Sequence, residues 1–327
     1  MRLPIRIVLT GILVFLAAAL SAHAQGITSF DFEAPGSAST EPVSINNAGA
    51  VTGTYADGGG VVHGFIRDGR GGFTSFDAPG ATVTRVVGIN NAGAVTGFYF
   101  GGSGPHGFIR DGRGSVTSFD PPGSTSTILT GINNVGAVTG FYSDGFRPHG
   151  FIRDGRGSIT SFDPPGATFT QAESINNAGA VTGFYFDGSG PHGFIRDGRG
   201  SFTRFDPPGS TSTGAQSIND AGAVTGSYRD VGGAVHGYIR DGRGSITTFD
   251  PPGSTLTVGL SINNVGAVAG YYSNGFGFHG FIRDGRGNFT SFDPPGSTFT
   301  QAFSINNAGA VTGHFLGGAG IHGFIRP

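Results

Sequence analysis

The phrase HGFIRP (322–327) ends the chain, whereas six earlier copies of it run on into a turn and a further strand-like segment. The copy at 149–166, for example, reads HGFIRDGRGSITSFDPPG. A strand that stops without a neighbour leaves a row of unpaired backbone N–H and C=O groups. The last copy therefore needs a partner from another part of the chain.

These copies belong to a repeat that fills most of the sequence. An Ile-Asn motif, a His-Gly-aromatic motif and a Phe-Asp motif each occur seven times, and the Ile-Asn motifs are 43 or 44 residues apart. The isoleucines of the first motif are Ile45, Ile89, Ile132, Ile175, Ile218, Ile262 and Ile305. A fixed period of this length indicates an array of identical supersecondary units.

Each unit contains four short apolar runs separated by turn residues. In the unit 168–210 the runs are TFTQAESIN, AVTGFYF, HGFIR and SFTRFD, and Asn-Ala-Gly, Asp-Gly and Pro-Gly sequences separate them. Such runs between turn residues are typical of strands joined by hairpins. No run after residue 24 follows the 3.6-residue period of a helix. The pattern predicts an all-β chain.

Four strands in a unit of about 43 residues are typical of a propeller blade. The chain begins with a lone copy of the fourth segment, GITSFDF (26–32), and ends with a lone copy of the third, 322–327. We therefore expect a seven-bladed β-propeller of four-stranded repeats, closed by pairing of these two segments. The alternative, an open β-solenoid, would need distinct capping repeats instead.

The first residues have the order of a secretory signal peptide. MRLPIR is basic, residues 7–20 are apolar, and SAHAQ supplies small residues before a cleavage site after Ala24. A transmembrane anchor is the alternative, but the apolar run is shorter than the roughly 20 residues that span a bilayer. We expect a signal peptide over 1–24, a single propeller domain over 25–327, and a protein that is secreted, extracellular or periplasmic, without a membrane anchor.

Three motifs together resemble a known repeat family. HGFIRDGRG, SFDPPGST and SINNAGAVTG are similar to the HAF repeat of extracellular bacterial repeat proteins, and the resemblance covers nearly all of 26–327. Here the phrase is His-Gly-Phe rather than His-Ala-Phe, and SFDPPG stands in place of a Leu-Gly-rich strand. The resemblance implies export and a β-rich repeat fold, and it brings no catalytic residues.

Every unit also carries the His of the His-Gly-aromatic motif and the Asp of the Phe-Asp motif, and five of the seven place a Ser before Ile-Asn. Ser, His and Asp could form a catalytic triad, but Gly88 and Gly131 replace the Ser in two units. Seven equivalent pairs fit a structural hydrogen bond repeated in each blade better. The expected structural network comprises His63, His106, His149, His192, His236, His279 and His322, with Asp31, Asp77, Asp120, Asp163, Asp206, Asp250 and Asp293.

The remaining motifs argue against other classes of site. The Asp-Gly-Arg-Gly turns offer one carboxylate beside two arginines, which is too few oxygens for calcium. The histidines of the His-Gly-aromatic motif are one per unit and about 43 residues apart, so the close ligand spacing of a zinc site is absent. The net charge of −2 is spread evenly, without the basic stripe of a nucleic-acid-binding protein. We expect no metal, no cofactor and no nucleic-acid partner.

The differences between the copies point to one face. Because strands alternate in direction, the first and third loops of each unit share a face, and these loops hardly vary. The opposite side, which we call the variable face, holds the second loop and the residues that lead into Ile-Asn. The first strand of a blade lines the channel, so polar residues four or two positions before each isoleucine become candidate ligand-binding residues: Glu41, Arg85, Gln171, Glu173, Gln216 and Gln301. Neutral variation at exposed positions is the alternative.

These observations favour a secreted, monomeric binding module whose ligand is a glycan or a protein surface. A structural extracellular matrix protein is the first alternative. The second is a polysaccharide hydrolase or lyase that would use Glu41 and Glu173 as paired carboxylates. The sequence offers no further general acid or nucleophile, so we expect binding rather than catalysis.

Overall fold

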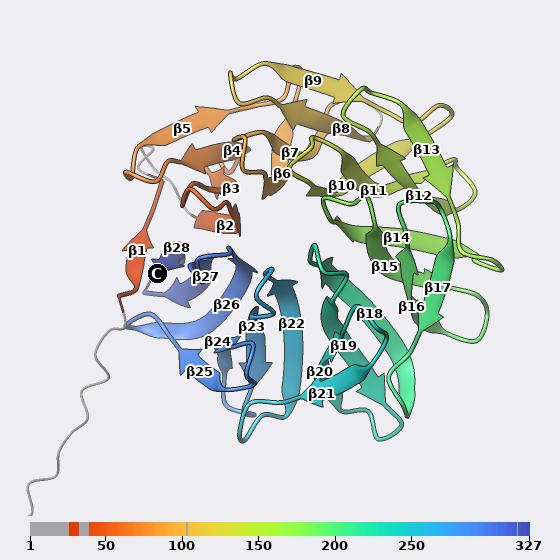
Figure 1. Cartoon of the computed structure of the whole chain (residues 1–327). Helices are drawn as coiled ribbons and strands as arrows, with labels where there is room; N and C mark the ends of the chain where they lie inside the picture. The colour runs from red at the N-terminus through yellow and green to blue at the C-terminus, as the bar shows by residue number, and fades with distance from the viewer. Residues whose placement is uncertain (1–25, 33–38, 103, 319) are drawn as a thin grey trace, which may run out of the picture.

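The computed structural model describes residues 26–32, 39–102, 104–318 and 320–327. In this part the chain forms 28 β-strands and no helix (Figure 1), so the expectation of an all-β chain is confirmed. It follows that the described residues include no helix long and apolar enough to cross a membrane. The signal peptide expected over 1–24 lies outside the described residues.

The strands fall into groups of four, each an antiparallel sheet that runs from the centre of the molecule to its rim (Figure 1). The inner strands are β2 (Ser39–Ile45), β6 (Val83–Ile89), β10 (Ser126–Ile132), β14 (Phe169–Ile175), β18 (Ser210–Ile218), β22 (Leu256–Ile262) and β26 (Ser297–Ile305). The second strands are β3 (Val51–Ala56), β7 (Val95–Phe100), β11 (Val138–Ser143), β15 (Val181–Phe186), β19 (Val224–Asp230), β23 (Val268–Ser273) and β27 (Val311–Gly317).

The outer half of each group contains two further strands. The third strands are β4 (Val62–Arg67), β8 (Pro105–Arg110), β12 (Pro148–Arg153), β16 (Pro191–Arg196), β20 (Val235–Arg240), β24 (Phe278–Arg283) and β28 (Gly320–Arg326). The outer strands are β5 (Phe73–Phe76), β9 (Val116–Phe119), β13 (Ile159–Phe162), β17 (Phe202–Phe205), β21 (Ile246–Phe249), β25 (Phe289–Phe292) and β1 (Thr28–Phe30).

Strand β1 is the partner of the last strand. It pairs antiparallel with β28, with Ser29 opposite Phe324 and Phe30 opposite Gly323. The C-terminal phrase therefore has a neighbour, and that neighbour comes from the other end of the sequence. Between groups the backbone contact is slight: β28 and β2, for instance, share one parallel pair, Ser39 with Ile321.

Aromatic packing joins each group to the next. The phenylalanine that ends an outer strand meets, edge to face, the buried aromatic residue of the next third strand, with ring centroids 5.7–6.4 Å apart. An arginine of the same third strand lies 4.7–5.4 Å from the same ring. Phe30 of β1 follows this rule, because it contacts Phe65 and Arg67 of β4. Such contacts add to the free energy gained by burying the rings.

A ladder of asparagine side chains joins the groups near the channel. Oδ1 of Asn46 accepts the N–H groups of Ala48 and Ala50 at 3.0 and 2.9 Å, which holds the turn after β2. Its Nδ2 donates to the carbonyl of Asn90 in the next group at 3.1 Å. The same bond recurs at each Ile-Asn motif, and Nδ2 of Asn306 donates back to the carbonyl of Asn46 at 3.0 Å.

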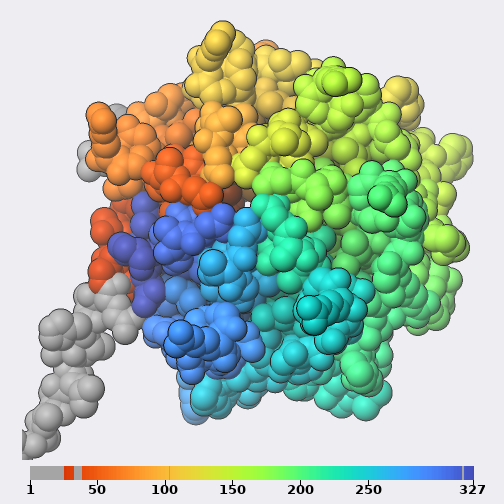
Figure 2. Space-filling view, in the orientation of Figure 1, coloured from red at the N-terminus to blue at the C-terminus, as the bar shows by residue number. Residues whose placement is uncertain are grey.

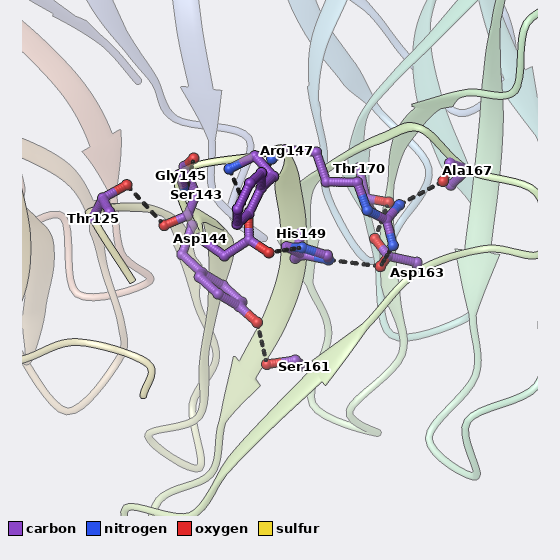
Figure 3. A network of polar contacts seen from close by, with 12 residues as sticks. Thr125, Ser143, Asp144, Gly145, Arg147, His149, Ser161, Asp163, Ala167 and Thr170 are labelled. Carbon is purple, nitrogen blue, oxygen red and sulfur yellow. Dashed lines mark hydrogen bonds and ion pairs between the residues drawn. The ribbon is translucent and has the colours of Figure 1, made fainter. Parts of the chain in front are cut away.

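The repeat histidines and aspartates meet near the rim of each group. In every group Nδ1 of the histidine lies 2.7–2.9 Å from a carboxylate oxygen of the aspartate that follows the outer strand. Figure 3 shows the group in which His149 lies between Asp163 and Asp144. Thr170 of the next inner strand donates to the second oxygen of Asp163 at 2.6 Å, so this aspartate also ties two groups together.

Removing β1 tests how much the molecule depends on its terminal pair. Deletion of residues 26–32 should lower the melting temperature sharply, because β28 loses its antiparallel partner. Phe65 and Arg67 also lose the ring of Phe30. The single change Phe30→Ala should destabilise the protein by about 3 kcal/mol, measured by urea unfolding. Phe146→Ala, at a ring that is 95% exposed, is the control. A deletion variant that melts like the full chain would refute the prediction.

The terminal pair should also respond to pH. The hydrogen bond to Asp31 raises the pKa of His322, although partial burial acts in the opposite direction. The protonated histidine is therefore favoured in the folded state, and its contribution is complete below the unfolded pKa of about 6.5 and is lost as the pH rises through the folded pKa. Stability should fall as the pH rises above about 6.5, and less steeply in Asp31→Asn. Equal slopes in urea unfolding of the two proteins would contradict this.

Candidate functional site

The inner strands surround the centre of the molecule, where the lobes formed by the groups meet (Figure 2). Ser39 pairs with Ala56 and Ile45 with Val51, so the start of β2 and the end of β3 lie on the same face. The loop between β3 and β4 is therefore on the variable face. The loops after β2 and β4 lie together on the other face, which we call the invariant face. There Gly69 lies so close to the carbonyl of Ala48 that a Cβ would crowd it.

Every inner strand has a β-bulge two residues before its isoleucine. In β2 the pairing jumps from Pro42 opposite Gly53 to Ser44 opposite Thr52, which leaves Val43 unpaired. The same irregularity recurs at the corresponding residue of each inner strand, and the seven bulge residues are Val43, Val87, Thr130, Glu173, Gln216, Leu260 and Phe303. A bulge redirects a side chain and is frequent beside binding sites.

A glycine on the second strand makes room for each bulge. A Cβ at Gly53 would overlap the carbonyl oxygen of Glu41, and the equivalent glycine of every second strand meets the same obstacle. Only glycine allows the inner strand to approach this closely. The glycine of the recurrent AVTG sequence is the signal from which the bulge could have been predicted, and the sequence analysis did not use it.

The bulge residues line a cavity in the channel of about 310 Å³. Its wall also includes the residue before each isoleucine, which is Ser in five groups and Gly88 and Gly131 in the other two. Nearer the invariant face, a cavity of about 200 Å³ is lined by the isoleucines and by a double ring of asparagines, in which Asp220 replaces one asparagine. The channel thus has a uniform end and an end that differs from group to group.

The six candidate residues occupy two layers of the inner strands. Glu173 and Gln216 are bulge residues and line the 310 Å³ cavity. The other four lie two residues earlier in their strands, toward the variable face, and do not line it. They are Glu41, Arg85, Gln171 and Gln301. All six side chains are partly buried.

Two of the outer-layer residues form an ion pair. Nη1 of Arg85 lies 3.8 Å from Oε2 of Glu41, and both side chains are partly exposed, so the pair adds little to stability. His314 of β27 is also near Glu41. Burial lowers the pKa of His314, although the Glu41 carboxylate acts in the opposite direction. The imidazole packs against Phe303 with ring centroids 5.0 Å apart.

Glu173 is the one ionisable residue among those that line the cavity. Nε2 of Gln171 donates to its Oε1 at 2.7 Å. Burial raises the pKa of Glu173 to about 7, although the hydrogen bond from Gln171 acts in the opposite direction. Desolvation disfavours the charged form of a carboxyl group. This carboxyl group therefore changes its charge near neutral pH.

The serines before the isoleucines bind backbone rather than histidine. The hydroxyl oxygens of Ser44, Ser174, Ser217, Ser261 and Ser304 each accept the N–H of an isoleucine in a neighbouring group at 3.3–3.4 Å. Within the described ranges no hydrogen bond joins these serines to a repeat histidine. The histidines lie on the third strands, so the structure does not bring these serines to the His–Asp pairs. In the fourth group a different serine does contact such a pair: Oγ of Ser189 lies 2.9 Å from Nε2 of His192, and Nδ1 of His192 lies 2.9 Å from Asp206. Oγ of Ser189 donates its proton to Asp187 at 2.7 Å. The described ranges hold no group of three His, Asp or Glu side chains placed to bind a metal ion.

No protein-family model matches the chain, and no curated protein matches it. Solved structures do. The β-propeller domain of the trilobed protease from Pyrococcus furiosus has a TM-score of 0.63 at 13% identity, covering 89% of this chain and 95% of that one. Virginiamycin B lyase from Staphylococcus aureus has a TM-score of 0.62 at 12% identity, covering 92% and 99%.

A third structure, TolB from Acinetobacter baumannii, has a TM-score of 0.50 at 17% identity, over 70% of this chain and 59% of that one. At such identities the similarity concerns the fold alone. Together with the repeated four-stranded sheets, it establishes that the fold of this chain is a β-propeller.

Proposed function

We propose that the protein is an exported binding module, in which a closed seven-bladed β-propeller presents a ligand site on its variable face and at its channel mouth. Export is supported by the basic, apolar and small-residue order of residues 1–24. The resemblance to HAF-repeat proteins points the same way. We propose a monomer, without a membrane anchor or a nucleic-acid partner.

The closed, seven-bladed form is supported by contacts that return to the first group. Strand β1 supplies the fourth strand beside β26, β27 and β28. The asparagine ladder runs from Asn46 through the other groups to Asn306 and back to Asn46. With both ends held in this way, each four-stranded sheet acts as one blade of a ring.

The observation that carries the proposed function is that the bulge residues of the inner strands differ from group to group. Six residue types occupy the seven bulge positions, whereas the isoleucine and the asparagine that line the channel nearer the invariant face are the same in every unit. A purely structural repeat would need no such difference between groups. Binding residues are often carried at the ends of strands and on loops of a rigid scaffold.

Exposed aromatic rings on the same face support a glycan or a protein surface as the ligand. Phe146 and Phe276, in the loops before β12 and β24, are 95% and 98% exposed. Exposed rings of this kind stack on flat apolar surfaces or fill pockets of a partner. A structural matrix protein would use the blades equivalently, and these two rings occur in only two of the seven loops.

The hydrolase or lyase alternative has less support. It would use Glu41 and Glu173 together, but Glu41 faces Arg85 whereas Glu173 accepts a hydrogen bond from Gln171. The two carboxylates belong to the first and fourth groups and lie in different layers of the channel. Binding therefore accounts for these residues better than catalysis does.

A glycan array tests the proposal. Protein comprising residues 25–327 should bind a subset of bacterial and plant cell-wall glycans printed on the array. The double variant Phe146→Ser/Phe276→Ser and the double variant Glu41→Gln/Arg85→Ala should each weaken that binding at least tenfold, because they remove the stacking rings and the polar mouth residues.

The matched control is Val135→Ser/Val265→Ser. These valines are 67% and 69% exposed in the same two groups, but on the invariant face, so their replacement should leave binding unchanged. If the protein binds no glycan and no cell surface, the proposed function is wrong. It is equally wrong if both variable-face variants bind like the parent protein.

A further inference from the structure

The seven bulge residues divide the wall of the channel cavity into two arcs. Thr130, Glu173 and Gln216 stand on the consecutive inner strands β10, β14 and β18 and form a polar arc. The remaining four are apolar and also consecutive around the centre, because β2 packs beside β26. They are Leu260, Phe303, Val43 and Val87. The cavity therefore presents a polar wall opposite an apolar wall.

Thr130 and Glu173 offer acceptors to a ligand, whereas the amide of Gln216 offers an acceptor and donors. The hydroxyl of Thr130 donates to the carbonyl of Ala172 at 2.8 Å, so only its lone pairs are left for a ligand. Gln171 occupies Oε1 of Glu173, and Oε2 has no hydrogen-bond partner among the described residues. A carboxylate held away from water without a counter-charge is costly. A cationic group that donates a hydrogen bond to Oε2 of Glu173 would supply this counter-charge.

No protein cation fills this place in the described part of the chain. Arg85, one layer nearer the variable face, is paired with Glu41. The residues that line the cavity include no Arg, Lys or His. An ammonium group can donate three hydrogen bonds and accepts none. It could therefore donate to Oε2 of Glu173 and to the hydroxyl oxygen of Thr130.

The size of the cavity limits what else the ligand can carry. At about 310 Å³ it is near the lower end for ligand pockets and about twice the roughly 150 Å³ of an apolar cavity that holds benzene. A single apolar group of the size of one aromatic ring would cover Leu260 and Phe303 while an ammonium group reaches Glu173.

We propose that the channel cavity binds a small amphiphilic amine, with its ammonium group at Glu173 and its apolar body against the arc of Leu260, Phe303, Val43 and Val87. The inference rests on the proposed function, because it names the chemical class of ligand that this end of the channel takes. It adds a site deeper in the channel than the exposed rings of the variable face.

Calorimetric titration with phenethylamine tests the inference, with 2-phenylethanol as the neutral compound of nearly equal shape. Phenethylamine should bind saturably to the 25–327 protein, and the alcohol at least tenfold more weakly. Glu173→Gln, which keeps the shape of the side chain and removes its charge, should weaken the amine at least tenfold and leave the alcohol unchanged. Equal binding of amine and alcohol, or equal binding by parent and variant, would overturn the inference.

Asp220→Asn is the matched control. It removes the one carboxylate from the asparagine rings at the other end of the channel, and it restores the residue that the other six groups carry there. Amine binding should stay within twofold of the parent value. If Asp220→Asn weakens the amine as much as Glu173→Gln does, the amine is attracted by net charge alone and the site at Glu173 falls.

The pH dependence of binding gives a test that needs no correctly folded variant. Because burial raises the pKa of Glu173 to about 7, amine affinity should fall below pH 7 and approach a tenfold loss per unit once the carboxyl is protonated. The titratable and charged groups in the neighbouring layer are Glu41, Arg85 and His314. Protonated His314 would also repel an amine, so the difference between parent and Glu173→Gln isolates Glu173. A flat profile between pH 5 and 8 refutes the site.

The two proposals can fail separately. Loss of glycan binding in Phe146→Ser/Phe276→Ser with normal amine binding supports both sites. Glycan binding without saturable binding of phenethylamine overturns the amine site and leaves the proposed function standing. If neither ligand class binds, both proposals are wrong.

Discussion

The close approach of each inner strand to a glycine of the second strand is the contact on which the channel depends. The carbonyl oxygen of Glu41 lies where the Cβ of the facing residue would be. Gly53 has no Cβ and so leaves that space free. The inner strand can then accommodate one extra residue as a bulge, and that residue lines the channel. Without this glycine the strand would have to run straight, and successive side chains would alternate between the two faces of the sheet. The bulge residues, which differ between the groups, thus line the channel because the backbones of the first two strands pack closely at this glycine.

Side-chain contacts hold neighbouring groups together at several distances from the centre. Asparagine side chains bond to the next group's backbone beside the channel, as Asn46 does to Asn90. Farther out, Thr84, Thr170 and Thr213 donate to the aspartates of the preceding His–Asp pairs. Between the sheets, rings meet edge to face beneath an arginine. Because the backbone ladders hardly cross between groups, side chains supply most of the polar contacts from one group to the next. Each bond is worth about 1 kcal/mol, and its loss costs more where it leaves a buried group unpaired.

The strands and their order could be predicted from the sequence, because the apolar runs and the turn residues recur with nearly the same spacing in every unit. The split repeat also pointed to the pairing of the two ends, and β1 lies beside β28 as expected. The pairing of Glu41 with Arg85 was not foreseen, because strand numbering does not say which neighbouring side chains touch across two sheets. The bulge was missed for a related reason. It shifts the two-residue alternation of the strand by one position, and the only trace in the sequence is the glycine of a different strand. The asparagines were taken only as turn residues, although Asn46 also reaches the next group.

The pairing of β1 with β28 has a consequence for the order in which the molecule can form. Within a group, strands that pair are close in sequence, so their loops are short and close quickly. Strand β1 is the exception, since Phe30 pairs with Gly323 at the far end of the chain. During synthesis, β1 would emerge long before β28, so it would wait for its partner until the rest of the chain had been made. In that interval two edges stay open, one on β1 and one on the growing chain, and each could pair with a second copy of the protein. Exchange of β1 between molecules would produce dimers with the same contacts, and crowding of nascent chains would favour it.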